Sequence, residues 1–215
     1  MQKLNINEYI ELAKNDFQLA ITYDIKSDDN VVAKAIYKNV FDFYNHDSEF
    51  SGDVVFSWKS SSLVKDGVFI GKRVDKKYNR IENNHYIGNL FPNSLTDKKF
   101  SLNTNRNGTM GDFPHDYFDI FLTHVAKYGY GIKDIPIEVK EYYPLKRAIL
   151  HDKNLDFFKS FKTFDNYLEK NFFTEIWKYI CNKKPFSDMK FEEYKEESLK
   201  LIKSRGEQMV QKLIR

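Results

Sequence analysis

Hydrophobic positions near the start of the chain recur every three or four residues, which is the period of an amphipathic helix. Residues 5–17 (NINEYIELAKNDF) predict a short helix, and residues 31–45 (VVAKAIYKNVFDFYN) predict a second one with a regular apolar face. Asn and Asp side chains precede both segments and are suited to capping a helix. The expected caps are Asn5 or Asn7 for the first helix and Asp29 or Asn30 for the second.

Between Gly52 and Leu102 the pattern changes to short runs rich in Val, Ile, Phe and Tyr, separated by Gly, Asn, Asp and Ser. Such runs are typical of strands. We expect a small antiparallel or mixed sheet here, with Pro92 at a strand end. The runs are VVFSW (54–58), GVFIGKRV (67–74), HYIGNLF (85–91) and KKFSLN (98–103).

Helical periods return after the sheet. Pro114 suits a first helical turn, and Gly129 and Gly131 close the segment that follows it. The sequence therefore predicts one α+β domain over residues 1–215, in which the sheet at about 52–102 packs with N-terminal helices and a C-terminal helical region. The further expected helices cover residues 144–150, 155–161 and 163–180 and a last segment from about Ser187.

Composition narrows the class of protein. Hydrophobic residues make up 41% of the 215 residues, with 19 Phe and 14 Tyr, so the chain has enough apolar area for a core. The 34 basic and 31 acidic residues are evenly mixed, and this balance does not favour nucleic acid. The many Lys and Asn residues are typical of an AT-rich genome, as in some bacteria and their phages.

The single cysteine, Cys181, excludes an internal disulfide, and the chain carries neither an apolar leader nor a run long enough to span a bilayer. We expect a cytoplasmic protein with no cofactor, no bound metal and no membrane association.

The polar stretch 102–122 is the first candidate site. Its Asn- and Gly-rich part carries Arg106 and leads into a helix with Asp116 and Asp119. N–H groups of the loop and the helix, together with a guanidinium, can bind an anion, and Asn103 would join such a site. The aspartates compete for the same guanidinium, so we favour a structural pairing of Arg106 with Asp116 or Asp119.

Other chemistry in this region is weaker. His115 and Asp119 lie four residues apart and could hold a divalent ion with Asp112, although polar residues are also common in a first helical turn. Glu138 and Lys140 have the spacing found in some nucleases, but the acids upstream of them fall on a predicted helix.

A basic segment forms the second candidate site. Residues 71–80 (GKRVDKKYNR) read as a hairpin with one aromatic side chain, which could hold phosphates and stack on a base. The alternative is a solvated hairpin whose lysines protect an edge strand. The residues concerned are Lys72, Arg73, Lys76, Lys77, Tyr78 and Arg80.

Four segments resemble, in the same order, those of an uncharacterised family of bacterial proteins. In that family a loop similar to Asn-Gly-Ala-Arg-Gly precedes a helix similar to Asp-Arg-Phe-Asp-Leu, and the resemblance extends from about Phe17 to Arg205. Asn107 and Tyr117 depart from the pattern. The segments are TYDIKSD, IGNLFPNSLTDKKFSLNTNR, DYFDIFL and LDFFKSFKTFDNYLEKNFF, and the matching residues are Asn103, Arg106, Asp116, Phe118 and Asp119.

The resemblance implies no activity. Two hypotheses on function follow from the sequence. The first is a non-enzymatic binding protein whose partner is a protein or a ribonucleoprotein; inhibitors of nucleic-acid-directed defence systems, carried by phages or mobile elements, are one subclass. The alternative is an enzyme that acts on a nucleotide or nucleic acid, with its site around Arg106, Asp116 and Asp119.

Overall fold

The chain is mostly helical, with a small antiparallel sheet, so the α+β prediction is confirmed. The computed structural model describes residues 4–45, 49–56, 64–65, 68–69, 85–94, 102, 118–138 and 141–215. Its α-helices are α1 (Ile6–Asn15), α2 (Phe17–Thr22), α3 (Val31–Val40), α5 (Phe118–His124), α6 (Tyr143–Ile149), α7 (Asp152–Ser160), α8 (Phe164–Lys170), α9 (Thr174–Asn182) and α10 (Phe191–Leu213).

The sheet pairs β1 (Phe50–Val54) with β4 (Leu90–Ser94) in antiparallel register. A second antiparallel pair consists of β2 (Val64–Lys65) and β3 (Val68–Phe69). Pro92 lies inside β4 opposite Gly52, and not at a strand end as we expected. Proline has no N–H to donate to a ladder, and within the described residues β1 is the one neighbour of β4.

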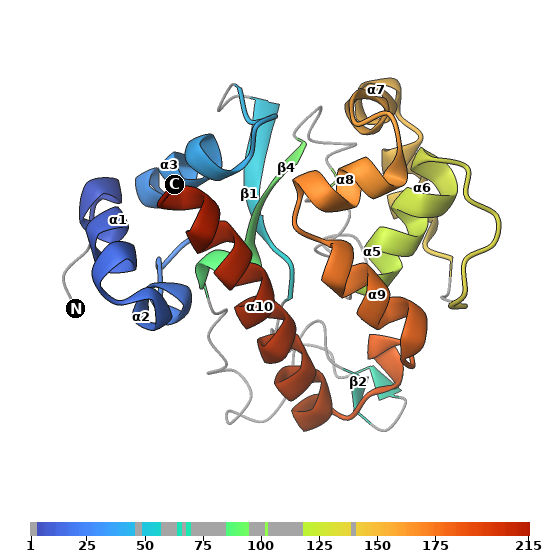
Figure 1. The fold of residues 1–215 in the computed structure, drawn as a ribbon. Helices are drawn as coiled ribbons and strands as arrows, with labels where there is room; N and C mark the ends of the chain where they lie inside the picture. Colours follow the sequence, from blue (N-terminus) through green and yellow to red (C-terminus); the bar gives the residue numbers. More distant parts are fainter. Residues whose placement is uncertain are drawn as a thin grey trace.

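Figure 1 shows how these elements are arranged. The sheet stands between the N-terminal helices α1–α3 and the group α5–α9, and the long helix α10 runs diagonally beside it. The end of α10 lies next to α3, where Asp42 accepts hydrogen bonds from Lys170 of α8 and Lys212 of α10 at 3.0 and 2.7 Å. These two ammonium groups lower the pKa of Asp42. The last helix is therefore attached to both helical groups.

The two helices predicted near the start of the chain correspond to α1 and α3, and both begin where their caps were expected. The side chain of Asn5 accepts the N–H groups of Asn7 and Glu8, and that of Asn30 accepts the N–H of Ala33. The helix α3 ends at Val40, five residues before the end of the predicted segment 31–45. The aromatic residues that follow leave the helix to pack elsewhere. The ring of Phe43, for example, lies 5.1 Å from that of Phe161.

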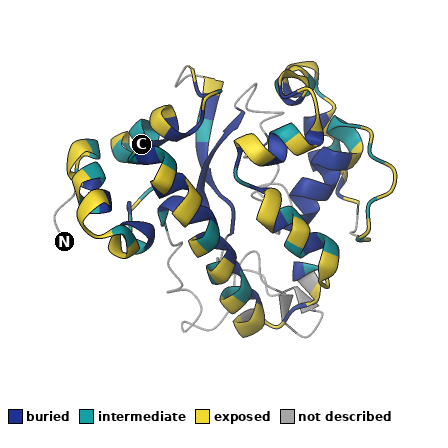
Figure 2. Ribbon diagram, in the orientation of Figure 1, coloured by how far each residue is buried: buried dark blue, intermediate teal, exposed yellow. Residues whose placement is uncertain are grey.

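Buried apolar side chains from α1 to α10 form a connected cluster. Figure 2 shows that the strands β1 and β4 are almost entirely buried, whereas the outer helices bury one face. All seven residues of α5 are buried. Aromatic rings meet edge to face in this cluster, as Phe118 does with Phe173 at 4.9 Å.

An arginine lies at the centre of the molecule. The side chain of Arg205, on α10, is 1% exposed. Its Nη1 donates to the carbonyl oxygens of Gly88 and Leu90, each at 2.8 Å, and its Nε donates to that of Asn171 at 3.1 Å. Nη2 has no hydrogen-bond partner within the described residues. Burial lowers the pKa of this guanidinium to about 9, so it stays charged at neutral pH.

Two aromatic rings complete the surroundings of Arg205. Its guanidinium carbon lies 4.9 Å from the ring centre of Phe173 and 5.8 Å from that of Phe41. The negative faces of such rings attract a cation. Within the described residues Arg205 forms no ion pair. Its charge is instead stabilised by the carbonyl dipoles and by the faces of the two rings, which replace the water that it loses on burial.

Close approach of two backbones lets Arg205 reach the sheet. The residues Ile87–Asn89 form a 3₁₀ turn, η3, where the run 85–91 predicted strand alone. A Cβ on Gly88 would stand 1.9 Å from the carbonyl oxygen of Ile202 and 2.5 Å from the nitrogen of Gly206, so neither contact would be tolerated. The absence of a side chain at Gly88 is what allows α10 to lie directly on this turn.

The predicted helix over residues 163–180 is wrong in one respect. It is interrupted between α8 and α9, where Phe172 has a positive φ of 57°. Asn171 is buried at this break, and its side chain donates to the carbonyl of Tyr167 at 2.9 Å. The interruption frees the carbonyl of Asn171, which accepts from Arg205.

We predict that Arg205→Ala destabilises the fold by about 3–5 kcal/mol, because it leaves three buried carbonyl groups without their donor and opens a void. Arg205→Lys should recover little of this loss, since one ammonium cannot reproduce a fork that reaches two segments. Urea unfolding measures both effects. Lys203→Ala, at an exposed position of the same helix, is the control. Equal unfolding midpoints for Arg205→Ala and Lys203→Ala would contradict the central role of this side chain.

Candidate functional site

Of the residues predicted to form a site, the structure describes Asp119. Both interpretations of the Arg106 region and of the basic segment therefore stay predictions. The other predicted site residues, which lie outside the described residues, are Lys72, Arg73, Lys76, Lys77, Tyr78, Arg80, Asn103, Arg106 and Asp116.

Asp119 is buried on α5 and bonds to the backbone of the chain itself. Its Oδ2 accepts the N–H of Phe186 at 2.8 Å, and its Oδ1 accepts the N–H of Ile120 at 2.9 Å. Phe186 begins the turn η5 (Phe186–Asp188), which precedes α10. Burial raises the pKa of Asp119 to about 6, and the two N–H donors oppose this shift. Asp119 thus connects α5 to the segment that starts the last helix.

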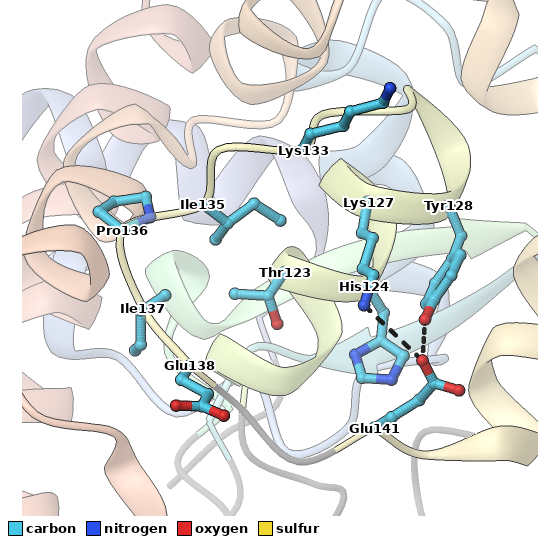
Figure 3. Close-up of a pocket in the computed structure, with 10 residues that line it drawn as sticks. All are labelled: Thr123, His124, Lys127, Tyr128, Lys133, Ile135, Pro136, Ile137, Glu138 and Glu141. Atoms are coloured by element: carbon cyan, nitrogen blue, oxygen red, sulfur yellow. Dashed lines mark hydrogen bonds and ion pairs between the residues drawn. The ribbon is translucent and has the colours of Figure 1, made fainter.

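A pocket of about 390 Å³ lies between α5 and the irregular segment 131–138 (Figure 3). The helix α5 continues into a single π-helical turn, η4 (Val125–Gly129), and a turn of this kind is common near functional sites. The predicted end of this helix at Gly129 is confirmed. The lining residues are Thr123, His124, Lys127, Tyr128, Lys133, Ile135, Pro136, Ile137, Glu138 and Glu141.

His124 forms the wall of the pocket and uses both ring nitrogens. Its Nδ1 bonds to the carbonyl of Ile120 at 2.8 Å, and its Nε2 accepts the N–H of Tyr142 at 2.9 Å. This pair of bonds requires the neutral ring with its proton on Nδ1. Burial lowers the pKa of His124 to about 4. His124 therefore joins α5 to the start of α6 and is not available as an acid or base in this state.

The open side of the pocket carries a cluster of charged side chains around Tyr128. The Tyr128 hydroxyl donates to Glu141 Oε2, Lys146 donates to Glu141 Oε1 at 2.9 Å, and Lys127 lies 3.7 Å from Oε2. The ammonium groups of Lys146 and Lys127 also lie 4.7 and 5.2 Å from the centre of the Tyr128 ring. The Tyr128 hydroxyl and the two lysines hold the pKa of Glu141 at about 2.

Two other lining residues carry charge without a partner. Lys133 and Glu138 are exposed and form no ion pair within the described residues. Between them Ile135, Pro136 and Ile137 present an apolar surface, and Glu138 and Ile137 take part in no backbone hydrogen bond of the described chain. Of these residues, Glu138 was the one candidate identified from the sequence, as part of a nuclease-like spacing with Lys140. The one signal in the sequence is the group of apolar residues at 135–137, which follows the glycines that close the helix.

A second pocket, of about 650 Å³, opens beside the end of β1 and the helix α7. Phe43, Phe50 and Phe157 form its wall, and the rings of Phe43 and Phe157 lie 5.9 Å apart. Lys153 and Glu49 stand at its edge. The charged groups of this pocket are fewer than those around Tyr128, and no hydrogen-bonded cluster of the described residues lines it.

The described residues do not form a metal site. Among the described residues no three His, Cys, Asp or Glu side chains gather closely enough to hold an ion. Likewise, none of the helices in the described ranges has the length and apolar character needed to cross a membrane.

No family model, curated protein or solved structure matches this chain. The resemblance to an uncharacterised bacterial family thus stays a prediction.

The raised pKa of Asp119 has a consequence for stability. Because the folded pKa of about 6 lies above the ordinary carboxyl pKa of 3.8, Asp119 contributes stability that is present below about pH 4 and lost as the pH rises through 6. We predict that the unfolding free energy of the wild type, relative to Asp119→Asn, falls by about 3 kcal/mol over this range. Urea unfolding at several pH values measures it. A constant difference between the two proteins would refute the prediction.

His124 should act in the opposite direction. Its folded pKa of about 4 lies below the ordinary imidazole pKa of 6.5, so its contribution to stability is present above about pH 6.5 and lost as the pH falls through 4. We predict an imidazole that titrates near pH 4 and carries its proton on Nδ1 at neutral pH. Nitrogen-15 NMR measures both properties, and His124→Gln, which lacks the signal, assigns it. A midpoint near 6.5 would show that the bonds to Ile120 and Tyr142 do not hold the ring.

Proposed function

We propose that this chain is a binding protein and that it holds a segment of a protein partner in the pocket between α5 and residues 131–138. The observation that carries the proposal is the make-up of this pocket. An apolar wall of Ile135, Pro136 and Ile137 faces a cluster of charged groups around Tyr128. An apolar centre with a polar and charged rim is the usual composition of a protein–protein contact.

Backbone groups near the bend at Pro136 and Ile137, which are free within the described residues, support a peptide-like partner. Backbone groups of Ile137 and Glu138, unpaired within the described chain, offer hydrogen bonds to an extended strand laid alongside. Tyr143, on the adjacent start of α6, is 64% exposed and provides further area for contact. An aromatic side chain of this kind is enriched at protein interfaces.

Rigid support for the site comes from the hydrogen bonds already described. His124 fixes the distance between α5 and the start of α6, so the wall of the pocket is formed before a partner arrives. A preformed site loses less conformational entropy on binding than one that has to be ordered. An inhibitor of a nucleic-acid-directed defence system would be one partner-binding protein of this type.

Site-specific crosslinking tests the proposal. A photoreactive amino acid replaces Glu138, which is exposed and lines the pocket, or Glu207, which is exposed on α10 and does not. We expect a defined partner to be crosslinked from position 138 and not from position 207. Ile137→Asp should weaken binding of the purified partner about tenfold or more, because it places a charge in the apolar wall.

A matched control separates binding from folding. Lys203→Asp introduces an acid on the exposed face of α10 and should leave the affinity unchanged. The melting temperature of each variant is measured beside its affinity. A partner that binds Ile137→Asp as tightly as the wild type, or that crosslinks equally from both positions, would overturn the proposed function.

A further inference from the structure

Glu141 occupies a set of groups that is suited to a carboxylate. One oxygen accepts from the Tyr128 hydroxyl and lies near Lys127 (Figure 3). The other oxygen accepts from Lys146. Two ammonium groups and one hydroxyl thus converge on the two oxygens of a single carboxylate. We call Lys127, Tyr128 and Lys146 the carboxylate cradle.

The three members of the cradle come from two elements that the core holds in place. Lys127 and Tyr128 belong to the π turn η4, and Lys146 belongs to α6. The His124 ring, which bonds to Ile120 and Tyr142, fixes the distance between these elements. The backbone positions that carry the cradle therefore keep their spacing when its carboxylate leaves.

Glu141 itself is held weakly. Its side chain is 46% exposed, and so are those of Lys127 and Lys146, at 56% and 30%. Ion pairs at such exposed positions contribute little to folding because water and salt screen them. A carboxylate from another molecule, brought in by further contacts with the apolar wall, can replace Glu141 at small cost.

We propose that the carboxylate cradle is the part of the pocket that selects the partner. In the free chain Glu141 fills it as an internal competitor, and in the complex an acidic side chain of an extended, partly apolar protein segment takes its place. This inference rests on the proposed function and adds the chemistry of the partner to it.

The lining favours a peptide over a nucleic acid. Ile135, Pro136 and Ile137 suit apolar side chains placed next to an acidic one. Glu138, on the same wall, forms no ion pair within the described residues, and its negative charge would repel a backbone with a phosphate at every nucleotide. A peptide can place an apolar side chain between acidic ones, whereas every nucleotide carries a phosphate.

Fluorescent peptides provide the test. The probes are an extended peptide of alternating leucine and glutamate, its glutamine counterpart, and a single-stranded RNA of 12 nucleotides, titrated at about 150 mM salt, where long-range charge effects are screened. In the wild type we expect the acidic peptide to bind more tightly than the glutamine peptide and than the RNA. Glu141→Gln, which empties the cradle of its charge, should tighten the acidic peptide by about fivefold.

Each variant has a control with the same change of charge in the same pocket. Glu138→Gln removes an acid that lines the pocket but does not touch the cradle, and should change the affinity by less than about twofold. Lys146→Gln should weaken the acidic peptide by about fivefold, whereas Lys133→Gln should not. In a Lys146→Gln background the added change Glu141→Gln should give no gain, because the two residues act on one site.

The outcomes separate this inference from the proposed function. Equal effects of Glu138→Gln and Glu141→Gln would show a response to net charge alone and overturn the cradle. Preferential binding of the RNA would overturn it too. If peptide binding is lost in Ile137→Asp but unchanged in Glu141→Gln, the cradle is refuted and the proposed docking pocket is supported. A peptide that ignores both changes would remove support from both.

Discussion

The buried guanidinium of Arg205 is the interaction on which the rest of the structure depends. It bonds to the backbone on both sides of the sheet turn, at Gly88 and Leu90, and to the break between α8 and α9, at Asn171. Gly88 and Leu90 are 117 and 115 residues from Arg205 along the chain, and Asn171 is 34 residues away. A charge buried without a carboxylate requires such fixed dipoles, so the positions of all three segments are constrained together.

The same device recurs elsewhere in the core. Asp119 accepts the N–H of Phe186, and His124 bonds to the backbone of Ile120 and Tyr142. In each case a buried polar side chain satisfies backbone groups where regular structure ends, because such groups are costly to bury unpaired. A fold with a five-residue-long sheet and many short helices has many ends of this kind. Its stability thus relies on a few polar side chains as well as on aromatic packing.

This reliance also explains how far the sequence could predict the fold. The helical period and the caps at Asn5 and Asn30 depend on neighbouring residues, and these predictions agree with the structure. The break at Asn171 depends on Arg205, which is 34 residues away, and the surrounding apolar pattern continues through it. An arginine in a helical pattern is normally assigned to the solvent face, so its burial against Gly88 could not be anticipated from local order.

The candidate site was predicted to a smaller extent. The sequence placed Asp119 on the helix that follows the polar stretch, and the structure shows it buried on α5. The pocket escaped prediction because its members approach only when the segment after Gly131 folds back along α5. Period and propensity describe residues on one element, whereas Tyr128, Glu141 and Lys146 meet from successive elements. The structure explains their contact, because His124 holds α5 next to the start of α6 through its bonds to Ile120 and Tyr142.

The division of roles within the pocket bears on how such a protein can change its partner. His124 and Tyr142 hold the wall through backbone bonds, so substitutions there alter the fold. Lys127, Lys133, Glu138 and Glu141 are exposed, and changing them costs little stability. Specificity is a difference between affinities, and exposed charges on a rigid wall can shift that difference without disturbing the core. In such a site the residues required for folding differ from the exposed residues that can change to suit a different partner.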